Sequence, residues 1–267
     1  MRKQLIAAAG AATFLLAGCA APQFRDLLPS QTVSVTPGAA PTSSDGTQAA
    51  QLLNWGPVTK GDEFNYTGAP DPAKWSVYDS VGHAGNGLRV PTVWNADGAV
   101  MRVSGDANGS TGGMGAKFDV GTVYNRVETR MRTGVRDQEY HPVLIVWPDG
   151  GWTSTSCPEI DYAEGGADTT LMQTFLHWPN TCAGQSTESR VLDTTQWHNY
   201  AVEWTAAGVK TYIDGVLLFA DTNAAHIPTG PMHQTIQLDW FPGDSAATNP
   251  QPSWMEVDWT REYGPAS

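Results

Sequence analysis

The chain has 267 residues, of which 40% are hydrophobic, 10% aromatic and only 16% charged. This composition is too aromatic and too weakly charged for a disordered protein or a coiled coil. The formal net charge is -12, so neither nucleic acid nor an anionic membrane surface is an electrostatically favoured partner. Tryptophan, with 11 residues, outnumbers tyrosine and phenylalanine, and this surplus hints at ring stacking on sugars beyond core packing.

The first residues have the features of an export signal. A basic start, MRK, precedes an apolar run at residues 5–16 that is too short to span a bilayer comfortably. The run ends in LAGC at residues 16–19, which resembles a bacterial lipobox. We therefore expect residues 1–18 to be a signal peptide and Cys19 to carry lipid, which would anchor an exported protein to the outer face of the bacterial cell membrane. The alternative is an ordinary signal peptide and a secreted protein.

The next segment differs in composition from the rest of the chain. Residues 19–53 are rich in Pro, Ser, Thr and Ala and carry hardly any charge, so we expect a flexible tether. All tryptophans follow it, between Trp55 and Trp259. Residues 54–267 contain no visible repeat and have the length of one domain, which we expect to be monomeric.

Short runs rich in β-forming residues recur through this domain, separated by Gly, Asn, Asp and Pro. The expected strands lie within residues 99–105, 125–133, 142–148, 174–178, 200–204, 209–220, 235–241 and 255–263. Their spacing of about ten residues predicts an all-β sandwich or jelly roll. The sequence YIDG at residues 212–215, between apolar runs, predicts a tight hairpin turn.

One predicted strand shows how the sheet faces differ. Thr235, Gln237 and Asp239 lie on one side of it, and the apolar side chains between them lie on the other. Such a strand belongs to a sheet whose inner face packs in the core and whose polar outer face can form a binding cleft.

The segment EIDYAE carries three carboxyl groups, at Glu159, Asp161 and Glu164. On a regular strand Glu159 and Asp161 share a face, whereas Glu164 points away. One extra residue, a β-bulge near residues 162–163, would return Glu164 to the first face. The two glutamates are then roughly 13 Å apart at Cα. Side chains that lean inward would bring their carboxyl groups to about 5–6 Å, the separation of a retaining glycosidase.

A solvated acidic strand is the alternative interpretation of this segment. Three like charges on one face are costly, however, and a structural protein has little use for them. An enzyme can use their repulsion to keep one glutamate protonated at neutral pH.

The same segment resembles the active-site signature of glycoside hydrolase family 16, the laminarinase and β-glucanase group, in its bulged form. Other stretches resemble family segments in the same order: residues 61–75 (GDEF…W), 124–132 (YNRVETRMR), 141–148 (HPVLIVWP), 197–215 (WHNYAVEW…YIDG) and 255–263 (MEVDWTREY). The resemblance covers about residues 55–265. It implies a concanavalin A-like β-jelly-roll sandwich.

The resemblance also implies chemical roles. Glu159 matches the nucleophile, Glu164 the general acid/base, and Asp161 the carboxylate that assists both. The implied activity is that of a retaining endo-glycosidase acting on β-1,3- or β-1,3-1,4-glucan without a required cofactor. A galactan-active hydrolase, a cell-envelope transglycosylase and a non-catalytic surface lectin are the alternatives, although a lectin has no need of a proton donor.

Further site residues are expected around the carboxyl groups. The resemblance makes Trp147 a sugar platform and places His177 on the neighbouring strand, facing the cleft. Trp152 on a loop is a second stacking candidate, and Gln237 is a polar contact from the polar face of its strand. Asp258 matches a family position that in some members ligates a structural calcium ion.

The three cysteines can be divided by position. If Cys19 carries lipid, Cys157 and Cys182 remain, and an even pair in an exported protein predicts a disulfide. An antiparallel hairpin that turns near residues 166–170 would bring the two opposite each other.

Overall fold

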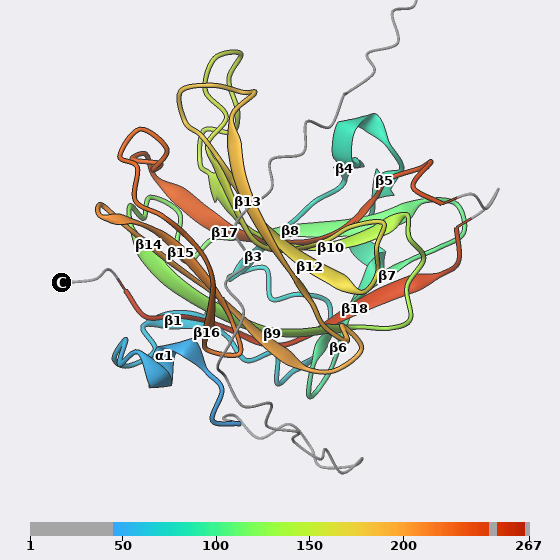
Figure 1. Ribbon diagram of the computed structural model, residues 1–267. Coiled ribbons are helices and arrows are strands. Elements are labelled where there is room, and N and C mark those ends of the chain that lie inside the picture. Colours follow the sequence, from blue (N-terminus) through green and yellow to red (C-terminus); the bar gives the residue numbers. More distant parts are fainter. Residues whose placement is uncertain (1–44, 246–249, 265–267) are drawn as a thin grey trace, which may run out of the picture. The chain divides into compact units, whose positions relative to one another are not determined.

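The computed structural model describes residues 45–245 and 250–264, so the predicted signal peptide, Cys19 and most of the predicted tether lie outside the described residues. Two nine-stranded sheets pack face to face, and Figure 1 shows them as the layers of one sandwich. The prediction of an all-β sandwich is confirmed. Among the described residues no helix is long and apolar enough to cross a membrane.

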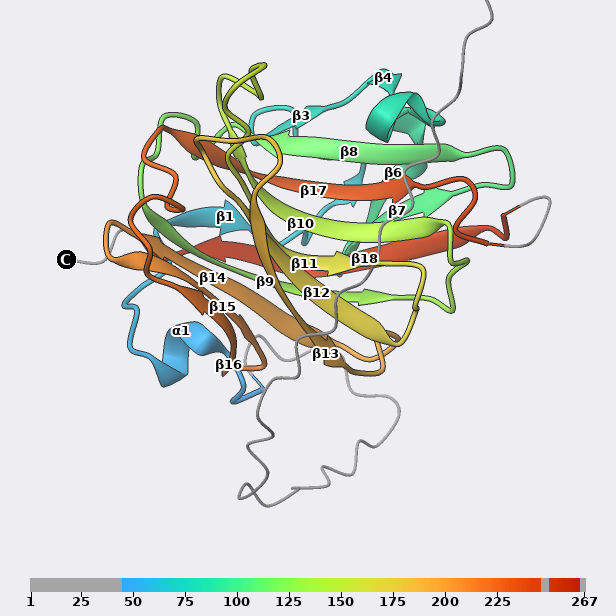
Figure 2. The same cartoon turned by 45° about the horizontal axis from the view of Figure 1, so that its top comes forward.

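The sheet that carries the EIDYAE segment is called the cleft sheet below. Its strands lie in the order β13 (Gln185–Val191), β12 (Leu171–His177), β11 (Glu159–Gly165), β10 (Tyr140–Pro148), β17 (Met232–Trp240), β8 (Ser110–Ala116), β5 (Leu88–Arg89) and β4 (Ser80–Val81), and β3 (Trp75–Val77) also pairs with β8. Figure 2 shows the central strands of this sheet, from β8 to β12, side by side.

The second sheet is called the outer sheet. Its strands lie in the order β16 (Val216–Asp221), β15 (Gly208–Ile213), β14 (His198–Thr205), β9 (Asn125–Thr133), β18 (Ser253–Glu262), β7 (Met101–Gly105), β6 (Trp94–Asp97) and β2 (Thr67–Gly68), and β1 (Lys60–Asp62) also pairs with β18. The helical elements are α1 (Ala49–Leu52), η1 (His83–Gly85) and η2 (Pro91–Val93).

The core between the sheets follows from the two-residue period of the strands. Along β12, Met172, Thr174 and Leu176 are buried, while the side chains between them are partly exposed on the opposite face. The largest fully buried side chains are aromatic or apolar: Trp75, Trp204, Trp259, Tyr140, Tyr162, Tyr200, Phe64, Met101, Met114, Met131, Leu144 and Ile160. The sandwich is therefore held together mainly by apolar surface that both sheets remove from water.

The predicted hairpin at YIDG is confirmed. It joins β15 to β16, and Asp214 and Gly215 have φ values of 52° and 72°. Two consecutive residues with positive φ match the right-handed twist of the flanking strands, and Asp-Gly tolerates this conformation well.

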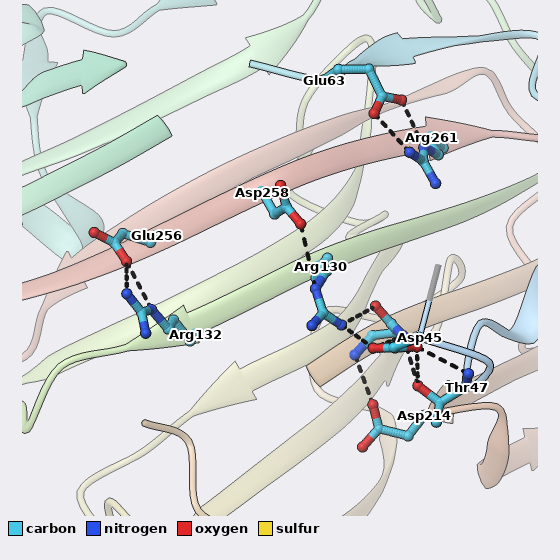
Figure 3. A network of polar contacts seen from close by, with 10 residues as sticks. Asp45, Thr47, Glu63, Arg130, Arg132, Asp214, Glu256, Asp258 and Arg261 are labelled. Atoms are coloured by element: carbon cyan, nitrogen blue, oxygen red, sulfur yellow. Dashed lines mark hydrogen bonds and ion pairs between the residues drawn. The ribbon is translucent and has the colours of Figure 1, made fainter. Parts of the chain in front are cut away.

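The predicted tether, residues 19–53, extends too far toward the C-terminus. Residues 45–53 contain α1 and pack on the outer sheet, where the backbone N–H of Ala49 donates to the carboxylate of Glu128 at 2.6 Å. Asp45 pairs with Arg130, and Asn199 donates to Asp45 at 3.0 Å, as Figure 3 shows in part. These contacts make residues 45–53 part of the folded domain.

Candidate active site

A β-bulge in β11 brings the three carboxyl groups to one face. On the neighbouring β10, Leu144 lies opposite Ala163 and Ile145 lies opposite Asp161, so Tyr162 is the extra residue. Tyr162 and Ala163 both face the apolar core. Glu164 therefore returns to the cleft face, and the predicted bulge is confirmed.

The face that receives these carboxyl groups is hollowed into a cleft of about 910 Å³. All of the predicted catalytic and substrate-binding side chains line it: Glu159, Asp161, Glu164, Trp147, Trp152, His177 and Gln237. A concave site with convergent polar and aromatic groups is the usual form of a ligand site. The cleft is therefore the candidate active site.

Aromatic rings form one wall of the cleft. Trp147 on β10 and Trp152 on the following loop stack with ring centroids 5.5 Å apart and an angle of 22° between the planes. Trp152 is 45% exposed and also contacts the ring of His177 at 5.8 Å. Because Trp152 covers Trp147, Trp152 offers the more accessible indole of this wall to a sugar ring.

The carboxyl groups are crowded and dry. Glu159, Asp161 and His177 offer ligand atoms within 4.8 Å of one another, and His177 Nε2 lies 3.3 Å from Asp161 Oδ2. Burial, then repulsion from Glu159 and Asp239, raises the pKa of Glu164 to about 8. Burial and the Asp161 charge likewise raise the pKa of Glu159, whereas His177 opposes that rise. The site thus retains protons at neutral pH, as a general acid requires.

The predicted disulfide is confirmed. Cys157 and Cys182 are bonded, with their Cα atoms 5.0 Å apart. Cys157 lies two residues before Glu159, and Cys182 lies in the loop that follows β12. The bond therefore fastens the loop that carries Trp152 at the start of the catalytic strand.

Asp258 lies on β18 of the outer sheet, as Figure 3 shows, and is not among the residues that line the cleft. Arg130 Nε is 3.4 Å from its Oδ2. The flanking pairs Arg132–Glu256 and Arg261–Glu63 add more guanidinium groups to this surface. A guanidinium already provides the positive charge beside Asp258, so these residues do not fit a calcium site of the kind that the resemblance implied.

The sequence patterns missed two polar pairs in the cleft. His233 Nδ1 lies 2.7 Å from Asp149 Oδ1, and Arg89 Nη2 donates to Asp239 Oδ1 at 2.7 Å. The alternation that identified Gln237 also places Asp239 and His233 on the same face. The same pattern could therefore have predicted that both side chains lie in the cleft. Arg89 lies on a strand of two residues, which gives no such pattern.

The geometry agrees with a match to a family model. The model for glycosyl hydrolases family 16 matches residues 92–261, which include the bulged carboxyl segment and most of the strands of both sheets. The chain belongs to glycoside hydrolase family 16. Its fold is the jelly roll of that family.

Two curated relatives of the family 16 chain act on different sugars. A keratan-sulfate endo-1,4-beta-galactosidase from Sphingobacterium multivorum is 27% identical. The alignment includes 86% of this chain and 62% of that protein. A beta-glucanase from Paenibacillus macerans is 32% identical over 116 residues, which are 40% of this chain and 46% of that protein. The chain thus spans less than two thirds of each of these relatives.

Solved laminarinase structures share the fold. The laminarinase from Rhodothermus marinus has a TM-score of 0.68 at 21% identity, with 79% of this chain and 98% of that chain covered. The catalytic domain of an endo-1,3-beta-glucanase from Thermotoga petrophila has a TM-score of 0.67 at 18% identity and the same coverage of 79% and 98%.

Proposed function

We propose that this family 16 protein is a glycoside hydrolase that cleaves internal linkages of a β-linked polysaccharide with retention, by double displacement. Glu159 attacks the anomeric carbon, and the bond to the leaving oxygen breaks as Glu164 donates a proton to that oxygen. Glu164 then removes a proton from water, which attacks the same carbon and releases Glu159. The chemistry needs only carboxyl groups and water, so we expect no cofactor.

The observation that carries this proposal is the bulged strand with its three carboxyl groups in one cleft. The pKa of Glu164 is raised to about 8 and that of Glu159 to about 10, so the pair holds a proton at neutral pH, and the resemblance to the family signature assigns the donor role to Glu164. Asp161 lies between the two glutamates in the sequence and contacts His177, so we assign it the positioning of both. A sugar-binding protein without catalysis gains nothing from this arrangement, which disfavours the lectin alternative.

We propose β-1,3- or β-1,3-1,4-glucan as the substrate. The beta-glucanase relative and the laminarinase neighbours support a glucan. A β-galactan is the second candidate, because the endo-1,4-beta-galactosidase relative aligns with far more of this chain than the beta-glucanase does. Sugars would stack on Trp152 and Trp147 and contact Gln237 and His177. Transfer to a sugar acceptor in place of water remains the alternative outcome of the second step.

We further propose that the enzyme is exported and held at the membrane by lipid on Cys19. The lipobox-like sequence supports this location, and the oxidised Cys157–Cys182 pair fits an oxidising compartment. Labelling of cells with a lipid precursor tests it, since replacement of Cys19 by Ser should abolish incorporation of the label.

Product analysis tests the activity. The purified chain is incubated with laminarin, lichenan, β-galactan, agarose and bacterial cell-wall polysaccharide, and the anomer released first is read by NMR. We expect shorter oligosaccharides of retained configuration from one glucan or galactan. Glu159→Gln should lower turnover at least about 10³-fold, and the exposed Glu188→Gln should not. Unchanged turnover of Glu159→Gln, or inverted products, would contradict the mechanism.

A further inference from the structure

A charged pair borders the cleft on the side of β5, away from the tryptophan wall. Asp239 projects from β17 on the same face as Gln237, and Arg89 reaches it from β5. Arg89 donates to Asp239 Oδ1 from Nε at 3.2 Å and from Nη2 at 2.7 Å. The Arg89 side chain is 15% exposed and that of Asp239 is 3% exposed. The pair is therefore nearly dry, yet it forms part of the cleft surface.

Aromatic rings hold this corner in place. The Arg89 guanidinium lies 5.6 Å from the centre of the Tyr78 ring. Phe241 stacks on His83 with centroids 4.6 Å apart and on the buried His141 at 4.1 Å. These contacts limit the orientations available to Arg89 and to the loop that carries His83, so the pair is preorganised.

The charged residues of the cleft determine whether the Arg89–Asp239 pair can bind a charged or an uncharged sugar. Arg89 is the one Arg or Lys among the described cleft-lining residues, and Asp239 already neutralises it. The other carboxyl groups in the lining are Asp149, Glu159, Asp161 and Glu164, and its histidines are His83, His177 and His233. A sulfate or a uronic carboxylate would find no unpaired Arg or Lys in this lining. A sugar hydroxyl can accept from a guanidinium and donate to the adjacent carboxylate at once.

We propose that Arg89 and Asp239 form a subsite that selects an uncharged sugar through its hydroxyl groups and rejects a sugar that carries sulfate or carboxylate. The proposal rests on the proposed glycosidase function and narrows its substrate class to neutral glucan or galactan. It thereby excludes a sulfated glycan such as the keratan sulfate named for the 27% identical relative. The competing explanation is a purely structural link between β5 and β17. A nearly buried ion pair is a weak source of stability, however, and apolar residues would join two strands as well.

Matched oligosaccharides test the proposal. The wild-type enzyme is given neutral and sulfated forms of the same backbone, glucan and galactan in turn, and kcat/KM is measured for each. We expect the neutral form to be favoured at least about tenfold. Asp239→Asn leaves Arg89 unpaired, so the ratio of neutral to sulfated kcat/KM should fall at least about tenfold. The matched control is Glu256→Gln, another buried carboxylate with arginine partners, but on the outer sheet.

Three results would overturn the subsite. The wild type could favour the sulfated form, folded Asp239→Asn could keep the wild-type ratio, or Asp239→Asn and Glu256→Gln could change it equally. If Asp239→Asn does not fold, Arg89→Lys replaces it. Lysine keeps the charge but loses the planar fork, so KM for the neutral form should rise severalfold with little change in kcat. An unchanged KM for Arg89→Lys would refute the proposal.

Failure of the proposed function gives a different result. If no oligosaccharide is cleaved at all, the glycosidase mechanism is wrong. The subsite is then judged by calorimetric binding of the same neutral and sulfated pairs to the wild type and to Asp239→Asn. Preference for the neutral form that is lost in Asp239→Asn would sustain the subsite, and equal binding of both forms by the wild type would refute it.

Discussion

The hydroxyl of Tyr162 links the bulge in β11 to the outer sheet. It lies 2.9 Å from Thr129 Oγ1 on β9 and accepts a bond from Gln234 Nε2 on β17 at 2.7 Å. Thr129 in turn lies 2.7 Å from Thr260 Oγ1 on β18. All of these side chains are buried. Tyr162 is also the extra residue of the bulge, so its hydroxyl fixes the backbone between Asp161 and Glu164.

We expect Tyr162→Phe to destabilise the protein by about 1 kcal/mol. The ring still fills its place, and Thr129 and Gln234 each lose one hydrogen bond inside the buried core but keep others, to each other and to Thr260. The loss of one such hydrogen bond has a net cost of this size. Tyr200→Phe is the matched control. Tyr200 is also fully buried, but its hydroxyl has no hydrogen-bond partner among the described residues. Its removal should change stability little or increase it.

Thermal unfolding followed by tryptophan fluorescence measures both variants. For a domain of this size each kcal/mol shifts Tm by about 2–4 °C, so Tyr162→Phe should melt several degrees lower than Tyr200→Phe. Because the bulge positions Glu164, kcat should also fall more than KM changes in Tyr162→Phe. Equal stability of the two variants would refute the reasoning.

Three further predictions concern pH, metal and the disulfide. Because Glu164 acts as an acid and its pKa is about 8, kcat/KM should fall as pH rises through about 8. Asp239→Asn removes a nearby negative charge, favours ionised Glu164 and should move this fall to lower pH; a move to higher pH would contradict the assignment. Addition of EDTA should leave Tm unchanged, since Arg130 already pairs with Asp258, and a drop of several degrees would show a structural metal. Replacing both disulfide cysteines with serine should cost about 2–4 kcal/mol and raise KM through the loosened Trp152 loop; intact mass after alkylation verifies the bond, and a wild-type KM would argue against its role in the cleft.

The features that the sequence predicted depend on local periodicity. The polar face of β17 follows from strict alternation, so Gln237 could be assigned to the cleft from its own strand, whereas His177 was assigned through the family resemblance. The bulge could be predicted because Glu164 has the wrong parity for a regular strand. The disulfide could be predicted because a short hairpin brings its two cysteines together.

The features that the sequence did not reveal depend on distant contacts. Residues 45–53 have the composition of a linker, and contacts with residues far away in the sequence fix them to the domain, such as Asp45 with Arg130 and the N–H of Ala49 with Glu128. Arg89 reaches the cleft because a two-residue strand happens to pair with β8, which no local pattern indicates. The position of the Arg130 side chain beside Asp258 likewise could not be predicted from the sequence. The expected calcium site was therefore based on the Asp258 carboxylate alone.

The bulge in β11 has a consequence for how the active site tolerates changes of chain length. Tyr162 and Ala163 both face the core between Asp161 and Glu164. Deletion of Ala163 would leave one core-facing residue there, and the strand would alternate regularly with all three carboxyl groups still on the cleft face. Deletion of Tyr162 would keep the same alternation but remove the side chain that ties the strand to the outer sheet. The catalytic arrangement can thus survive the loss of one residue, provided that the tyrosine is the one retained.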